Sequence, residues 1–154
     1  MKVTVVTATE KPIDVISLAA GSSTRKDDVK YKRVERCTLD GHSVSEFADV
    51  TFKIEGISRT CLAQLTRHRM ASYCVESQRY NKYNFDGEDW YVVPPYIQES
   101  ENLLNRYQTS MTYAALQYKA MLDDGVKAED ARFVLPEATK TNLHMKINAR
   151  ALFN

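Results

Sequence analysis

The residues with the clearest capacity for chemistry are a run of basic side chains near the middle of the chain. Arg67, His68 and Arg69 are consecutive, and Ser77 and Arg79 follow them within ten positions. An arginine guanidinium is a planar fork of N–H donors that meets phosphate or carboxylate oxygens in pairs. Most short basic runs are solvated surface, but this one follows an apolar helix face and leads into aromatic, uncharged sequence. We therefore interpret it as a candidate anion-binding cluster.

The composition limits the kinds of partner that the chain can have. Its 154 residues are 44% hydrophobic and 27% charged, with a net charge of +1, as in a globular domain with its own core. No apolar run approaches the ~20 residues that span a bilayer, and the first residues lack a signal-peptide pattern. We expect no membrane partner and a cytoplasmic location. Nucleic-acid binding is the weakest interpretation, because no repeated basic stripe is present.

The cysteines indicate neither a disulfide framework nor a metal site. The chain has an odd number of cysteines, Cys37, Cys61 and Cys74, and no two of them have CxxC spacing. We therefore predict reduced thiols and no metal. Cys74 has no base adjacent in sequence, so we expect a small buried side chain rather than a reactive thiol.

Hydrophobic periodicity predicts the elements that would position these residues in the first half of the chain. Residues 2–7 alternate and are rich in Val and Thr, as in a strand, and residues 13–20 are compatible with a helix. Residues 25–32 are charged and should be exposed. Residues 48–54 alternate apolar and polar side chains, which predicts a strand with one buried face that ends at Gly56.

The second half is mostly helical by pattern. The expected elements are a helix from residue 57 into the basic run, a short strand at 90–93, a long helix at 99–122 capped by Gly125, a helix at 131–135 that stops at Pro136, and a final helix at 143–153. Strands and helices are grouped rather than strictly alternating. This predicts an α+β fold, an antiparallel or mixed sheet flanked by helices, in one domain over residues 1–154.

Several motifs occur in one order along nearly the whole chain, and together they resemble those of flavin-dependent thymidylate synthases. The basic run followed by Ser72, Ser77 and Arg79 is similar to the signature of that family. The other matching segments are residues 51–59, Ala131-Arg132-Phe133-Val134-Leu135-Pro136, Asn148-Ala149-Arg150 with Asn154 beyond it, and the loop with Gly41, His42 and Glu46.

The resemblance implies the reductive methylation of dUMP to dTMP. Methylenetetrahydrofolate would supply the carbon and NADPH the hydride, through FAD. It implies FAD contacts from Ser43, Glu46, Arg67, His68, Arg69, Asn148, Arg150 and Asn154. It implies dUMP contacts from Gln64, Ser77, Gln78, Arg79 and Arg132, with Ser77 and Arg79 positioning the substrate for catalysis. It also implies a homotetramer with sites between subunits.

Three of these residues also fit a second role. Ser77 would need an adjacent base to act as a nucleophile, and His68 is assigned to the flavin by resemblance, so we interpret Ser77 as a phosphate hydrogen-bond donor. Arg132 would otherwise pair with a carboxylate on its own helix. Asn148 would otherwise be an ordinary polar residue.

The chain also departs from the family pattern. Cys74-Val75 replaces a polar pair, the loop at 42–46 is one residue short and lacks a proline, and Phe47 replaces a histidine. Family chains continue beyond the segment that Asn148 begins, with a further arginine for the uracil. The alternative function is therefore a truncated, non-catalytic FAD- or nucleotide-binding module, or one half of a split enzyme. We expect turnover by this chain alone to be slow or absent.

Overall fold

The computed structural model describes residues 1–83, 85, 87 and 89–153. The backbone groups into two compact units. The first unit contains Met1, Glu55–Leu65 and Val75–Asn142, and the second contains Lys2–Ile54, Thr66–Cys74 and the chain from Leu143 onward. Each unit is described by itself below. Among the described residues, no helix is both long and apolar enough to cross a bilayer.

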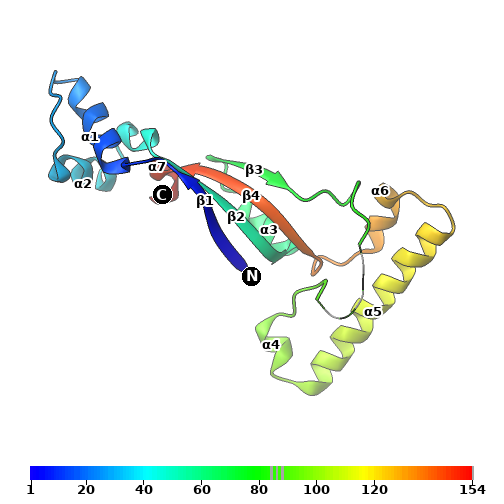
Figure 1. Ribbon diagram of the computed structural model, residues 1–154. Coiled ribbons are helices and arrows are strands. Elements are labelled where there is room, and N and C mark those ends of the chain that lie inside the picture. Colours follow the sequence, from blue (N-terminus) through cyan, green and yellow to red (C-terminus); the bar gives the residue numbers. More distant parts are fainter. Residues whose placement is uncertain (84, 86, 88, 154) are drawn as a thin grey trace. The chain divides into compact units, whose positions relative to one another are not determined.

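The β-strands in the described part of the chain form one four-stranded antiparallel sheet (Figure 1). Its strands are β1 (Lys2–Ala8), β2 (Asp49–Ser58), β3 (Ala71–Val75) and β4 (Lys140–Asn148), in the order β1-β2-β4-β3. Sheet and helices together confirm the predicted α+β class. The predicted first strand is confirmed as β1, whereas β3 was not predicted.

The segment predicted as a final helix is mainly a strand. Residues 143–148 belong to β4, and only α7 (Ala149–Phe153) is helical. Thr141, Leu143, Met145 and Ile147 are buried, and the residues between them are exposed. That period of two belongs to a strand with one covered face. The prediction was wrong because a short apolar run fits both periodicities, and only strand pairing decides between them.

Gly56 bends β2 rather than ending it. Eleven positions separate Ala48 from Arg59, but only ten separate their partners Thr139 and Ala149, so β2 carries one extra residue. Gly56 has φ of +71°, as in a glycine β-bulge. Its N–H donates to Asn142 Oδ1 over 3.0 Å, which satisfies the group that the bulge leaves unpaired. The strand therefore continues to Ser58.

The second unit adds helices beside its part of the sheet. These are α1 (Pro12–Ser22), which confirms the predicted helix, α2 (Tyr31–Leu39), which was not predicted, and the 3-10 turn η1 (Ser43–Phe47). Ile16, Val34 and Ala48 form their common core. Asp28 holds the loop between α1 and α2 by pairing with Arg33 and Lys30. These hydrogen bonds, the one from Arg33 having the larger effect, lower the pKa of the Asp28 carboxyl to about 2.

Gly21 should not accept a side chain without a shift of the neighbouring backbone. A Cβ atom there would lie 2.0 Å from the Lys26 carbonyl oxygen, a backbone atom that cannot swing away. We expect Gly21→Ala to lower the free energy of unfolding by about 1–3 kcal/mol through overpacking. Urea denaturation checks this, with the neighbouring exposed Ser22→Ala as control, expected to stay within about 0.5 kcal/mol of the parent. Equal stabilities for the two variants would contradict the steric argument.

The first unit is built on α5 (Glu101–Asp123), the long helix of the predicted pattern. Ser100 caps its N-terminus by accepting from the Leu103 N–H, and Gly125 follows its end with φ of +84°. The remaining elements are α3 (Arg59–Leu65), α4 (Pro95–Gln98), α6 (Ala128–Ala131) and η2 (Arg132–Val134). The predicted helix at 131–135 is thus the end of α6 and a 3-10 turn.

Two other predictions need correction. The strand expected at 90–93 is a single bridge between Tyr91 and Thr139, because Trp90 and Tyr91 turn their rings into a core with Met111 and Ala115. The helix α3 ends at Leu65, so the basic run lies in the turn that follows and not on the helix itself.

Candidate functional site

In the first unit, two arginines far apart in sequence converge on one acidic residue. Arg79 Nε lies 3.6 Å from Glu129 Oε2, and Arg132 Nε donates to the Glu129 carbonyl over 2.9 Å. Arg79 follows β3, whereas Arg132 begins η2. Each guanidinium also lies beside the ring of the next residue, Tyr80 or Phe133. The pair forms a site with two positive groups and one carboxylate.

A pocket of about 260 Å³ opens beside this pair. Its polar lining comes from Arg59, Gln78, Arg132 and Glu137, and its apolar lining from Phe133, Leu135 and Pro136. This volume is close to the lower limit of about 300 Å³ for small-ligand sites. Arg59 is held at the end of β2 by its N–H, which donates to the Thr139 carbonyl over 3.0 Å. The pocket can thus present two guanidinium groups and one amide to an anionic ligand.

Ser77 and Gln64 occupy different positions relative to this pocket. Ser77 Oγ accepts from the Arg79 N–H over 3.2 Å, which fixes the turn that carries Arg79. None of the three histidines of the chain belongs to the first unit, in which Ser77 lies. Gln64 is exposed near the end of α3 and does not line the pocket.

The second unit brings the other predicted residues together at one end of its sheet. Arg150 Nη1 pairs with Glu46 Oε1, which joins α7 to η1, the turn that begins at Ser43. Asn148 Oδ1 accepts from the Ala151 N–H over 2.8 Å and so caps α7. The ordinary structural role considered for Asn148 is therefore present, and its side-chain amide N–H groups remain for a further acceptor.

The basic run reaches the same end of the sheet. The Glu76 N–H donates to the Asn142 carbonyl over 2.9 Å, and counting along the antiparallel strands from this bond places Ala71 opposite Ile147. The turn at residues 67–69 comes just before β3, and it therefore lies near the end of β4 that carries Asn148. Arg67 and Arg69 are exposed, and neither forms an ion pair with a described residue.

His68 occupies a different environment from its neighbours. Its carbonyl accepts from the Tyr73 hydroxyl over 2.9 Å, which fixes the backbone of the turn. Its Nε2 atom is buried and has no hydrogen-bond partner among the described residues. An unpartnered buried nitrogen is costly, and this one fits a site that a polar ligand completes.

Other sequence predictions can now be placed. Cys74 is exposed, not buried, because it lies on the outward face of β3. Asn154 lies outside the described residues. Sequence reasoning missed the contribution of Glu129 and gave Arg59 no role. Glu129 stands three residues before Arg132, and this helical spacing was the one available signal. The described residues include no group of three potential metal ligands.

Comparison with known proteins finds a matching family model and several relatives. A family model described as thymidylate synthase complementing protein matches residues 4–154. The flavin-dependent thymidylate synthase of Geobacter sulfurreducens is 39% identical over 166 residues, which cover 100% of this chain and 71% of the relative. The flavin-dependent thymidylate synthase of Pyrococcus abyssi is 37% identical, and the match covers 99% of this chain and 68% of that enzyme.

Solved structures show the same fold. The Helicobacter pylori flavin-dependent thymidylate synthase complexed with FAD and dUMP matches with a TM-score of 0.76 at 26% identity, over 99% of this chain and 81% of that one. A UMP/dUMP methylase from Streptomyces cacaoi matches in fold, with a TM-score of 0.82 at 22% identity over 98% of this chain and 74% of that one. Fold and sequence therefore place the protein among the α+β enzymes that make thymidylate. The chain belongs to the flavin-dependent thymidylate synthase family.

Proposed function

We propose that this protein methylates dUMP to dTMP, with methylenetetrahydrofolate as carbon donor and NADPH as hydride source. The observation that carries the proposal is the meeting of Arg79 and Arg132 at Glu129, beside the pocket that Gln78 lines. Related enzymes that have this name, and the Helicobacter pylori enzyme that holds FAD and dUMP, support it.

The dUMP phosphate is assigned to Arg79 and Arg132. A dianionic phosphate competes with the single carboxylate of Glu129, and each guanidinium can donate two N–H groups to it. Ser77 adds a hydroxyl donor, and Gln78 and Arg59 face the rest of the nucleotide. The contact between Gln64 and dUMP stays a prediction. The side chain of Gln64 is exposed, and it does not line this pocket.

FAD is assigned to the second unit, whose residues fit it. Arg67 and Arg69 are unpaired among the described residues, and His68 presents a buried nitrogen without a partner in that same part of the chain. Ser43, Glu46, Asn148 and Arg150 gather at the same end of the sheet. When bound, FAD supplies hydride transfer. The protein supplies cations that hold a pyrophosphate and keep it in one orientation.

The pyrimidine ring must be ionised for its C5 atom to attack the carbon donor, because the negative charge of the ring makes C5 nucleophilic. A preorganised cation at that position is worth about 2.7–4 kcal/mol, or a factor of about 100–1,000 in rate. Two arginines of the first unit, Arg59 and Arg132, line the pocket. Arg132 bonds to Glu129, whereas no contact with Glu129 is found for Arg59 among the described residues. Arg59 is our candidate for this role.

Three measurements on the purified chain test the function. Flavin absorbance should show near-stoichiometric FAD, calorimetry should show dUMP binding, and tritium release from labelled dUMP should report turnover with NADPH and methylenetetrahydrofolate. FAD and dUMP binding without tritium release would favour a non-catalytic binding module. A colourless protein that no FAD titration changes would contradict the cofactor assignment.

The protein is further proposed to work as a single cytoplasmic domain that assembles into a tetramer. Support for assembly comes from β1, an edge strand whose residues are all exposed, Val3, Val5 and Val6 by more than half. Exposed apolar edges are usually covered by another chain. Light scattering should report an oligomer, and a monomer with full flavin occupancy would contradict this.

Removing the carboxylate of Glu129 should strengthen dUMP binding. Glu129→Gln frees Arg79 from an exposed ion pair, and such pairs are worth at most about 1 kcal/mol. We expect the dissociation constant for dUMP to fall by up to about fivefold in calorimetry. Asp123→Asn, exposed at the end of α5, removes the same charge and should have no effect. Weaker binding by Glu129→Gln would mean that the carboxylate aligns the arginines instead of competing.

A further inference from the structure

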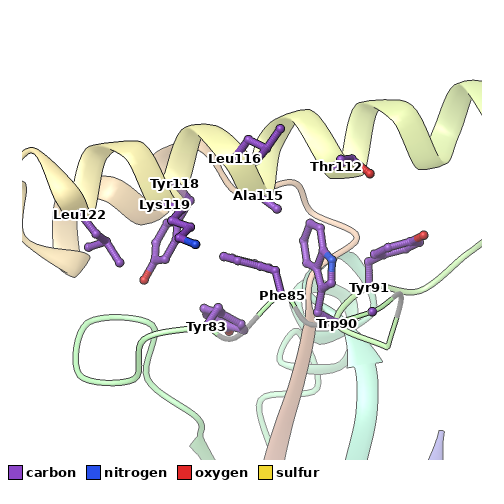
Figure 2. Close-up of a pocket in the computed structure, with 11 residues that line it drawn as sticks. Tyr83, Phe85, Trp90, Tyr91, Thr112, Ala115, Leu116, Tyr118, Lys119 and Leu122 are labelled. Atoms are coloured by element: carbon purple, nitrogen blue, oxygen red, sulfur yellow. The ribbon is translucent and has the colours of Figure 1, made fainter.

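A second cavity of the first unit has a chemistry that nucleotide binding does not use. It has a volume of about 380 Å³, within the range of about 300–1,000 Å³ of small-molecule sites. Figure 2 shows Phe85 and Trp90 facing α5, from which Tyr118 and Lys119 project. No residue is common to this cavity and the pocket around Arg132.

The walls of the cavity are aromatic rings in edge-to-face contact. The centroid of Phe85 lies 4.8 Å from that of Trp90 and 5.4 Å from that of Tyr118. Tyr83 completes this side, 6.5 Å from Tyr118. Burial raises the pKa of the Tyr83 phenol, so this wall stays uncharged. Such walls favour a planar aromatic ring, which can add another edge-to-face or offset contact.

Two polar groups of α5 specify the rest of a ligand. Tyr118 is 0% exposed, and its hydroxyl has no hydrogen-bond partner in the described part of the chain. In Figure 2 its ring extends from α5 on the side of Tyr83 and Phe85. Lys119 lines the same cavity, and no carboxylate of a described residue pairs with it. An unpartnered hydroxyl and an ammonium group on residues that line one cavity suit a carboxylate.

We propose that this cavity binds a small aromatic carboxylate, with its ring against Phe85 and Trp90 and its carboxylate toward Lys119 and Tyr118. Because Tyr118 is 0% exposed, contact with its hydroxyl requires a neighbouring ring to shift as the ligand binds. The site is independent of the FAD and dUMP assignments.

Trp90 is the single tryptophan of the chain and reports directly on the cavity. The probe is 3-phenylpropionate, titrated into the purified chain while the emission of Trp90 is followed. For a ligand of this size we expect a dissociation constant of about a few millimolar or tighter. Cyclohexanepropionate, which has no aromatic ring, should bind about two- to tenfold more weakly.

Two variants separate the polar contacts. Lys119→Gln should weaken 3-phenylpropionate by about two- to fivefold and leave the neutral 3-phenylpropionamide unchanged, while Lys127→Gln, on the surface of the same unit, should do neither. Tyr118→Phe removes an unpartnered hydroxyl, so it should fold normally and weaken the carboxylate by about two- to tenfold.

Several results would overturn the proposal. These are an unchanged Trp90 emission at roughly 20-fold the expected dissociation constant, equal binding of the cyclohexyl compound, and complete competition by saturating dUMP or FAD. The last result would assign the cavity to the nucleotide sites. Loss of flavin or dUMP binding would leave the readout from Trp90 intact, so the two proposals can fail separately.

Discussion

The double variant Arg67→Gln and Arg69→Gln is expected to lose FAD. Both side chains are exposed and unpaired among the described residues, so neither supports the fold through an ion pair there. Each hydrogen bond to a charged group contributes about 1.5–3 kcal/mol, so removing two should raise the dissociation constant at least about 100-fold. Flavin absorbance of the purified protein and titration of the apoprotein measure this.

The control is a pair of basic residues from the same unit. Lys32 and Arg36 are exposed on α2, and replacing both by Gln removes the same net charge. This control should keep FAD within about twofold, because neither side chain is among those assigned to the cofactor and an exposed charge contributes little by itself. If both double variants lose FAD equally, the effect is one of general charge. If neither does, the basic turn is only solvated surface.

The variant Arg132→Gln is expected to weaken dUMP binding by about 10–150-fold. The guanidinium lines the pocket and shares Glu129 with Arg79, so its loss removes a charge-assisted pair of bonds to the phosphate. Arg132→Lys keeps the charge but not the planar fork, so its affinity for dUMP should lie between those of the parent protein and Arg132→Gln. Calorimetry with dUMP measures all three proteins.

Arg132 also has a structural contact, which the experiment must separate from binding. Its Nε bond to the Glu129 carbonyl supports the turn from α6 into η2. The thermal stability of Arg132→Gln should therefore fall slightly, while FAD binding in the second unit should be unchanged. Arg106→Gln, exposed on α5, is the matched control. Parent-like dUMP affinity in Arg132→Gln would remove Arg132 from the phosphate site.

Some features of this protein follow from the sequence alone. The helix α5 can be predicted because several signals indicate the same element. Its 23 residues carry an apolar stripe, a serine caps its start and a glycine follows its end. The candidate anion-binding class also follows from residue types, since Arg67 and Arg69 on either side of a histidine, followed by Ser77 and Arg79, concentrate donors that suit an anion. The family motifs lie in order along the chain, and the family they indicated is the one to which it belongs.

The tertiary structure decided what depends on contacts between distant residues. Residues 143–148 became a strand because β2 and β3 supply hydrogen-bond partners on both sides, and Gly56 became a bulge because Asn142 satisfies its N–H. The pairing of Arg79 and Arg132 through Glu129 joins segments about fifty residues apart. Periodicity reports only which face of a local element is apolar. It carries no information on which distant element covers that face, and that pairing sets the position of the candidate site.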